Sequence, residues 1–232
     1  MAGEDLKETQ VTPSGLFGDR AYAFVDELNR SDFPWMTGRQ GRDMILFRAR
    51  FLTLPAVPSS SGAGDSAAAK DYSLEVTTPE GQTFRMGAAE FTEFLVARYR
   101  RPLRLRFSEQ SFTDAQPVSI FGLRTGGALS EETGIELDPR RFRANFYAQW
   151  NDERPYYENE LIGRALRMGD TVELRVIEKN ERCVMINLDP DTAAASPVVL
   201  ETVARKHDSC LGIYAQVLRE GIVHVGDAIH AI

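Results

Sequence analysis

Cysteine and histidine are scarce in this sequence. It contains two cysteines, Cys183 and Cys210, and three histidines among 232 residues. Two cysteines are too few for a disulfide framework, an iron–sulfur cluster or a structural zinc site, and the histidines lack metal-ligand spacing. We therefore expect both thiols to be reduced.

Long apolar runs and a surplus of positive charge are also missing. No stretch reaches the roughly 18 apolar residues that a membrane-spanning helix needs, and residues 1–15 lack the basic segment and apolar core of a secretory signal. The formal net charge is -7, which disfavours nonspecific binding to nucleic acid or to anionic membranes. The sequence therefore predicts a globular, cytoplasmic protein that binds neither nucleic acid nor membrane.

Short strands separated by turns dominate the pattern along the chain. Aromatic and branched residues predict strands, which cover residues 19–27, 43–52, 102–107, 140–148 and 170–186. The first two are expected to form an antiparallel pair, joined through the glycines of "MTGRQGR". A buried strand that runs into a turn and a short helix is expected over residues 116–134. Two further strands are expected over residues 211–232, with their turn at residues 219–221.

Residues 72–100 predict a hairpin followed by a helix. The hairpin turns at "PEG", residues 79–81. Phe91, Phe94 and Leu95 follow at the i, i+3 and i+4 spacing of one helix face.

Strands and helices do not alternate regularly, which favours an α+β protein built on mixed or antiparallel β-barrels with inserted helices. We expect an amino-terminal barrel domain over residues 1–107 and a second domain over residues 108–232. The segment Pro55–Asp71 is small, polar and aperiodic, so we expect a surface loop there without catalytic residues.

Several motifs in order carry a family resemblance. The sequence contains "SGLFGDRAYAFVDE", "TGRQ", "RRFRANF", "ERCVMINLDPDT" and "GIYAQVLREGIVHVGD". In this order they resemble the MOSC superfamily, the molybdenum-cofactor sulfurase carboxyl-terminal domain, with the amino-terminal β-barrel domain that usually precedes it. The chain is similar to the mitochondrial amidoxime-reducing component and its bacterial relatives. The resemblance implies a molybdopterin held between the two domains and reduction of small N-oxygenated substrates, with electrons from a separate iron–sulfur or flavin reductase.

Cys183 is the expected metal ligand. Molybdenum favours thiolate sulfur, and one protein cysteine suffices when the cofactor supplies the other sulfurs. The adjacent Arg182 would favour the thiolate. The alternative is that Cys183 packs as a small apolar residue. The resemblance gives Cys210 no role.

Guanidinium forks suit the cofactor phosphate, and an asparagine amide suits a heteroaromatic edge. Arg39, Arg143 and Asn145 fit these tasks, and relatives use the equivalent motif positions to hold the cofactor. Ala144 stands where the family usually has proline, which relaxes the backbone before Asn145. Arg20 and Tyr214 are second-rank candidates. For Arg20, an ion pair with Asp19 or Asp26 is an equally good assignment. For Tyr214, a place in the barrel core with a satisfied hydroxyl is an equally good assignment.

Asp189 is a candidate general acid, because cleavage of an N–O bond requires protons near the metal. "LDPDT" is also turn chemistry, in which aspartate side chains accept local backbone N–H groups. We favour the turn role for Asp191, while both roles remain open for Asp189.

Two other functions are compatible with the same residues. Cys183 could carry a persulfide and transfer sulfur, or the fold could serve as a non-catalytic binding module. Pyridoxal phosphate is associated with some MOSC-bearing enzymes, but no lysine stands out as a Schiff-base site.

The sequence begins late relative to the family. Relatives open with a strand that ends in a lysine and a serine that help to bind the cofactor, and this chain begins at the following turn. Loss of that strand would expose unpaired backbone groups on its neighbours. We therefore expect that Met1 is an internal methionine of a longer reading frame.

Overall fold

The computed structural model describes residues 1–52, 73–108, 110–113 and 115–232, so the loop expected at Pro55–Asp71 lies outside the described residues. The chain forms two compact units. The first contains Met1–Glu4 and Arg20–Phe112, and the second contains Asp5–Asp19 and Thr113–Ile232. The sequence predicts a single boundary between residues 107 and 108. The observed division differs, because the strand β1 (Glu8–Thr12) pairs with β13 (Gly221–His224) and so belongs to the second unit.

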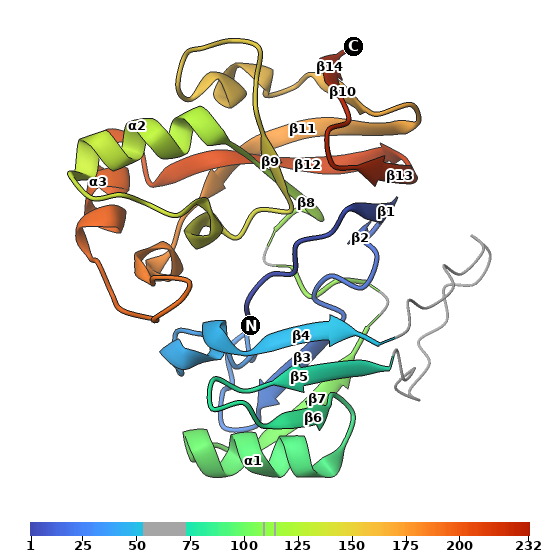
Figure 1. Ribbon diagram of the computed structural model, residues 1–232, viewed down its shortest axis with the longest axis vertical. Coiled ribbons are helices and arrows are strands. Elements are labelled where there is room, and N and C mark those ends of the chain that lie inside the picture. The colour runs from blue at the N-terminus through green and yellow to red at the C-terminus, as the bar shows by residue number, and fades with distance from the viewer. Residues whose placement is uncertain (53–72, 109, 114) are drawn as a thin grey trace. The chain divides into compact units, whose positions relative to one another are not determined.

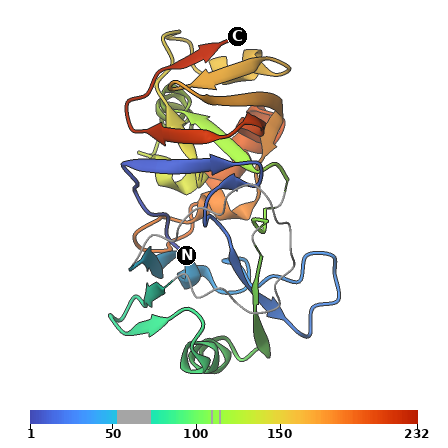
Figure 2. The same ribbon diagram turned by 90° about the vertical axis from the view of Figure 1, so that its right-hand side faces the viewer.

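Among its described residues, the first unit contains two antiparallel sheets, one α-helix and one 3-10 helix, whose arrangement is seen in Figure 1. Its elements are β3 (Tyr22–Asp26), η1 (Arg42–Leu46), β4 (Arg48–Phe51), β5 (Leu74–Thr77), β6 (Thr83–Arg85), α1 (Ala89–Tyr99) and β7 (Leu103–Phe107). One sheet has the order β4-β5-β6 and the other pairs β3 with β7. In Figure 2, α1 is seen end-on and lies beside β7.

Two elements of the first unit confirm the sequence pattern. β5 and β6 form the expected hairpin, with Val76 opposite Phe84. The spacing of Phe91 and Leu95 places both on the buried face of α1, where each is 0% exposed. They join the core of this unit together with Phe47 and Val76.

The strand expected over residues 43–52 is wrong in its first half. Met44 and Ile45 are both buried although they are consecutive, so they cannot alternate across a strand. They lie in η1, and only Arg48–Phe51 extend as β4. The expected pairing of this strand with β3 is also wrong, because β4 pairs with β5 and β3 pairs with β7.

The second unit is built on a six-stranded mixed sheet of order β14-β10-β11-β12-β8-β9 and a three-stranded sheet of order β13-β1-β2. Its strands not yet placed are β2 (Gly15–Leu16), β8 (Val118–Gly122), β9 (Phe146–Ala148), β10 (Ala165–Met168), β11 (Val172–Glu181), β12 (Cys210–Arg219) and β14 (Ile229–Ala231). Its helices are α2 (Leu123–Thr133), α3 (Val198–Lys206) and the 3-10 turns η2 (Pro139–Phe142), η3 (Tyr157–Leu161) and η4 (Val184–Asn187). β8 and β9 are parallel, whereas the other described pairs are antiparallel.

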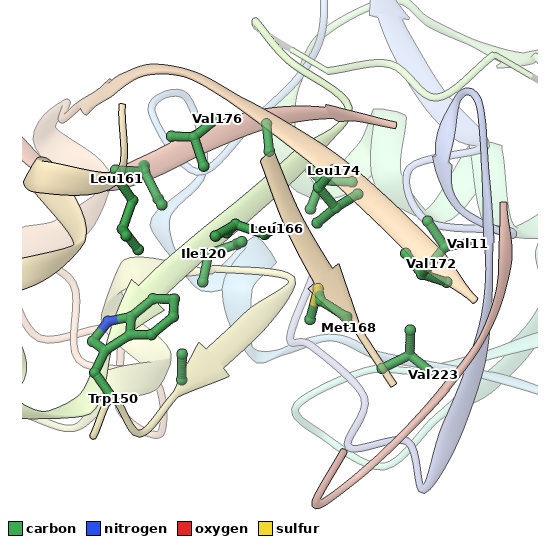
Figure 3. Close-up of a cluster of buried hydrophobic side chains, with 14 residues drawn as sticks. Val11, Ile120, Trp150, Leu161, Leu166, Met168, Val172, Leu174, Val176 and Val223 are labelled. Atoms are coloured by element: carbon green, nitrogen blue, oxygen red, sulfur yellow. The ribbon is translucent and has the colours of Figure 1, made fainter. Parts of the chain in front are cut away.

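An apolar cluster fills the space enclosed by these sheets (Figure 3). Val11 lies beside Val172 at one end of the cluster, and Trp150 and Leu161 lie at the other. Val11 is 0% exposed, so residues 5–19 supply part of the core of the second unit. A second cluster packs α2 and α3 against Phe121 and Phe142.

Several sequence expectations for this unit need correction. Residues 140–148 do not form one strand, because η2 occupies the first part and only Phe146–Ala148 are extended. β11 ends at Glu181, before the predicted end at residue 186. The two carboxyl-terminal strands exist, but β13 pairs with β1, and β14 is a third strand that the pattern missed. The α+β class with curled, mainly antiparallel sheets is confirmed. Among the described residues, no helix has both the length and the apolar content to cross a membrane.

Candidate functional site

Cys183 lies at the point where β11 gives way to η4. Its backbone is extended, and its carbonyl accepts a hydrogen bond from the amide of Ile186 at 3.2 Å, which closes the 3-10 turn. The side chain is partly exposed and forms no disulfide. A thiol on a fixed turn at the surface of a sheet is placed to contact a ligand, which a thiol sealed in the core could not do.

Arg182 directs its side chain into the protein and connects three segments. Its amide donates to the carbonyl of Ser209 at 2.7 Å. Its Nε donates to the carbonyl of Leu211 and its Nη1 to that of Phe142, each at 2.8 Å. The end of β11 is thereby joined to the beginning of β12 and to the end of η2.

The Arg182 guanidinium is deeply buried and has no carboxylate partner among the described residues. Its carbon lies 5.9 Å from the ring centre of Phe121 and 5.8 Å from that of Phe142. Burial lowers the pKa of Arg182 to about 10, which leaves it charged at neutral pH. Its Nη2 is buried without a hydrogen-bond acceptor.

Two further arginines join the same pair of motifs. Arg141, 6% exposed, donates to the carbonyl of Asn187 at 2.9 Å and to the Asp189 carboxylate at 3.0 Å. Arg140 pairs with Asp191 at 2.6 Å. The segment "RRFRANF" and the segment "ERCVMINLDPDT" are thus cross-linked by Arg140, Arg141 and Arg182.

Arg143 and Asn145 follow directly after these contacts. Arg143 caps η2 in the left-handed conformation, with φ of 50°. The Asn145 Oδ1 accepts from the amide and the hydroxyl of Ser119, each at 2.9 Å, and its Nδ2 donates to Asp19 at 2.9 Å. The Asn145 amide therefore links β8 to the segment after β2, and one of its N–H groups is left for a ligand.

Asp189 organises the turn that follows η4. Its Oδ1 accepts from the amides of Asp191 and Thr192 and from the Thr192 hydroxyl, at 2.9 to 3.1 Å. Burial raises its pKa, but these hydrogen bonds and the charge of Arg141 outweigh burial, so the net pKa is lowered. Asp189 is therefore an anion at neutral pH, which supports the turn role and leaves it without a proton to donate.

Tyr214 and Tyr147 lie within electrostatic range of the Arg182 guanidinium, as do both thiols. Tyr214 is half-buried on β12, opposite Ser119 of β8. Tyr147 accepts a hydrogen bond from the amide of Ala144 at 3.3 Å, and burial raises its pKa. Sequence analysis missed Tyr147, although its place two residues after Asn145 was an available signal.

Arg20 and Arg39 belong to the first unit. The Arg39 guanidinium lies 5.5 Å from the ring centre of Phe33, and its side chain is exposed. Arg20 has a left-handed backbone, with φ of 50°, and its carbonyl accepts from the amide of Phe112 at 3.0 Å. The second unit contains the other five candidates, Arg143, Asn145, Cys183, Asp189 and Tyr214.

The donor set of the second unit fits a cofactor that brings most of its own metal ligands. Among the described residues, no group of three or more histidine, cysteine, aspartate or glutamate side chains is arranged to hold a metal ion. The unit contains two partly exposed thiols, Cys183 and Cys210, together with the left-handed Arg143 and the Asn145 amide, which donates one N–H to Asp19. A thiolate with neighbouring cationic and amide donors suits a soft metal attached to a phosphorylated heterocycle.

The second unit is therefore an α+β unit with a curled sheet, and Cys183 lies in one of its two arginine-linked motifs. A sequence profile described as the MOSC domain matches residues 108–230. The chain belongs to the MOSC domain family, as its motifs predict. MOSC domains are often associated with molybdenum-cofactor binding, and the family includes enzymes.

Solved structures with similarity to this chain include three bacterial proteins. YiiM from Geobacillus stearothermophilus is 14% identical, with 50% of this chain and 54% of that chain covered and a TM-score of 0.40. The YUAD protein from Bacillus subtilis is 18% identical, with 57% and 69% covered and a TM-score of 0.41. YiiM from Escherichia coli is 13% identical, with 53% and 57% covered and a TM-score of 0.38. This chain thus spans little more than half of the length of either YiiM protein. The search of curated proteins gave no match.

Proposed function

We propose that this protein is a molybdenum-cofactor-dependent oxidoreductase that reduces N-oxygenated substrates, as the amidoxime-reducing proteins do. The observation that carries the proposal is the partly exposed Cys183. Its neighbour Arg182 donates a hydrogen bond to the carbonyl of Phe142, the residue that precedes Arg143. Two motifs far apart in the sequence are thereby joined by one side chain, which supports the proposal that they form one site. The MOSC family match supports the choice of cofactor.

Each residue of the second unit has a role in this proposal. The Cys183 thiolate would bind the molybdenum, since a soft sulfur donor suits this metal. Arg143 would hold the cofactor phosphate through its guanidinium. Asn145 would offer its remaining N–H to the pterin while Ser119 and Asp19 hold its amide in place. Arg39 and Arg20, on the first unit, remain candidates for further phosphate contacts.

When bound, the cofactor would supply a metal that changes oxidation state by two electrons. Reduction of an N-hydroxylated amine consumes two electrons and two protons and yields the amine and water. Because Asp189 is held as an anion, the protons would come from solvent. The chain offers no second redox centre among its described residues, so a separate iron–sulfur or flavin protein would deliver the electrons.

Metal analysis of the Cys183→Ser variant tests the proposal. The protein is produced in a cell that makes molybdopterin, and molybdenum per chain is measured for the wild type, Cys183→Ser and the matched control Cys210→Ser. We expect the wild type and Cys210→Ser to hold nearly one molybdenum per chain, and Cys183→Ser to lose the metal. Reduction of an aromatic amidoxime by a reduced viologen dye should follow the metal content.

Two results would contradict this function. Cyanide-labile sulfur on Cys183 without molybdenum would identify a sulfur carrier, and the absence of both would identify a binding module without a cofactor. A Cys183→Ser protein with full metal and activity would show that the thiol is not the ligand.

A further inference from the structure

The Arg182 side chain lies at the junction of the two motifs that are proposed to hold the cofactor. It directly precedes Cys183, and its Nη1 donates at 2.8 Å to the carbonyl of Phe142, which directly precedes Arg143. Its Nε donates at 2.8 Å to Leu211. A single rigid guanidinium thus fixes the backbone on both sides of the proposed site.

The burial of this charge is unfavourable for stability alone. The guanidinium is surrounded by Phe121, Phe142 and backbone carbonyls, makes no ion pair among the described residues, and leaves Nη2 without an acceptor. Burying a charged group without an ion-pair partner is costly unless hydrogen bonds compensate for the lost water. A residue that only filled this space would therefore not need to be arginine.

Arginine is required if two carbonyls must be held at fixed directions at once. Its planar fork presents Nε and Nη1 toward different acceptors, whereas the single ammonium group of lysine is a compact donor on a flexible stem. Gly212 makes room for the fork, because a Cβ at this position would lie 3.2 Å from Nη2 and 2.7 Å from the Ile120 carbonyl.

We propose that Arg182 is a positioning residue that holds the Cys183 thiolate and Arg143 at the separation that one bound cofactor requires. Arg182 does not touch the cofactor, because its free Nη2 is sealed from solvent. It acts through the backbone of residues 142 and 183. This inference rests on the proposed function, since it assumes that Cys183 binds the metal.

The test compares Arg182→Met and Arg182→Lys with the wild type and with Arg175→Met. Arg175 is the matched control because it is also on β11 and donates to one carbonyl, that of Gly163 at 3.0 Å, but from an exposed position. All proteins are produced in cells that make molybdopterin. Three quantities are measured: the thermal unfolding midpoint, molybdenum per chain after gel filtration, and the number of sulfur ligands to molybdenum by X-ray absorption.

We expect Arg182→Met to remain folded and to retain roughly tenfold less molybdenum, the loss typical of residues that orient a metal ligand. The molybdenum that remains should show fewer sulfur ligands, because Cys183 is displaced. Arg182→Lys keeps the charge without the fork, so it should lose metal similarly. Arg175→Met should match the wild type in all three measurements.

The outcomes separate this inference from the proposed function. A wild type without molybdenum contradicts the proposed function. A wild type with molybdenum, together with an Arg182→Met or Arg182→Lys protein of unchanged metal content and sulfur ligation, overturns the inference alone. If Arg182→Met does not fold, Arg182→Lys decides, and failure of both to fold would identify Arg182 as a folding residue and also overturn the inference.

Discussion

Gly212 shows how a single residue can determine the shape of the candidate site. Its φ of +71° lies in the left-handed region, where a side chain is strained. A Cβ there would also collide with the Ile120 carbonyl and crowd the Arg182 guanidinium. Gly134, at the end of α2, has nearly the same φ, +72°, but nothing lies within 4 Å of the position of a Cβ.

The variants Gly212→Ala and Gly134→Ala separate the cost of a left-handed backbone from the cost of the close contacts. Gly134→Ala should lower the free energy of unfolding by about 1 kcal/mol, the cost of the left-handed backbone alone. Gly212→Ala should cost roughly 2 kcal/mol more, because the close contacts add strain, and it should also reduce metal retention. Denaturant unfolding measures both values, and equal costs for the two variants would contradict the clash.

Asp189→Asn distinguishes a turn residue from a general acid. The substitution places an amide beside Arg141 and weakens the hydrogen bonds within the turn, so it should cost about 1–3 kcal/mol of stability. A general acid acts in its protonated form, so its pKa would set the alkaline limb of the pH–rate profile. Because Asp189 is already an anion, the alkaline limb should keep its position in Asp189→Asn. A lost or shifted alkaline limb would instead identify Asp189 as the proton donor.

At the scale of elements, Glu132 joins α2 to α3. Its carboxylate accepts from the Tyr156 hydroxyl at 2.8 Å and contacts His207 Nε2 at 2.8 Å. The ring centres of Tyr156 and His207 lie 4.3 Å apart. Partial burial raises the pKa of Glu132, but the hydrogen bonds from His207 and Tyr156 outweigh it, and the net pKa is lowered.

The lowered pKa of Glu132 predicts a stability that depends on pH. A carboxyl group whose folded-state pKa is lowered stabilises the fold above its unfolded pKa, and this contribution is lost as the pH falls through the folded pKa. Glu132→Gln should therefore destabilise the protein by about 1–2 kcal/mol at pH 7. The difference from wild type should shrink as the pH falls through the lowered folded-state pKa of Glu132, and it should be absent below that pKa. The exposed neighbour variant Glu131→Gln should show neither effect, and a Glu132→Gln deficit that persists at low pH would contradict this explanation.

The sequence predicted best those elements that depend on local spacing. The helix α1 follows from Phe91 and Leu95, and the hairpin β5–β6 follows from its turn residues. α3 was missed, although Val199 and Val203 are spaced i, i+4 and basic residues occupy its last turn. The pairing of β3 with β7 was not predictable, because it depends on contacts between distant segments.

The candidate site was predictable only in part, for the same reason. Motif order made Cys183 and Arg143 candidates, and their roles remain a prediction. The partners of Arg182 are carbonyls of Leu211 and Phe142, and a carbonyl carries no signal in the sequence. The state of Asp189 depends on Arg141, whose position follows from the packing of η2 against η4.

At the scale of the whole molecule, the second unit is discontinuous in sequence. Residues 5–19 contribute β1 and β2, and the buried Val11 joins the core of a unit whose remaining residues begin at Thr113. The matched MOSC region, residues 108–230, does not include this segment. The conserved-domain boundary and the physical boundary of the unit therefore differ.

A fragment experiment tests this boundary. A fragment of residues 113–232 should be poorly folded, because β13 loses its partner β1 and the core loses Val11. Addition of a peptide of residues 5–19 should restore cooperative unfolding, measured by circular dichroism. A peptide with Val11→Asp should not restore it. A fragment that unfolds cooperatively without the peptide would show that the segment is dispensable.

The pairing of β1 with β13 has a consequence for biosynthesis. Translation produces β1 long before β13, yet Glu8 of β1 pairs with His224 of β13. While the ribosome makes the intervening residues, the apolar side chain of Val11 has no place to pack, and the nascent strand presents an unpaired edge. Maturation of this half of the protein must therefore follow synthesis of β13, and chaperones that shield nascent strands would act in that interval.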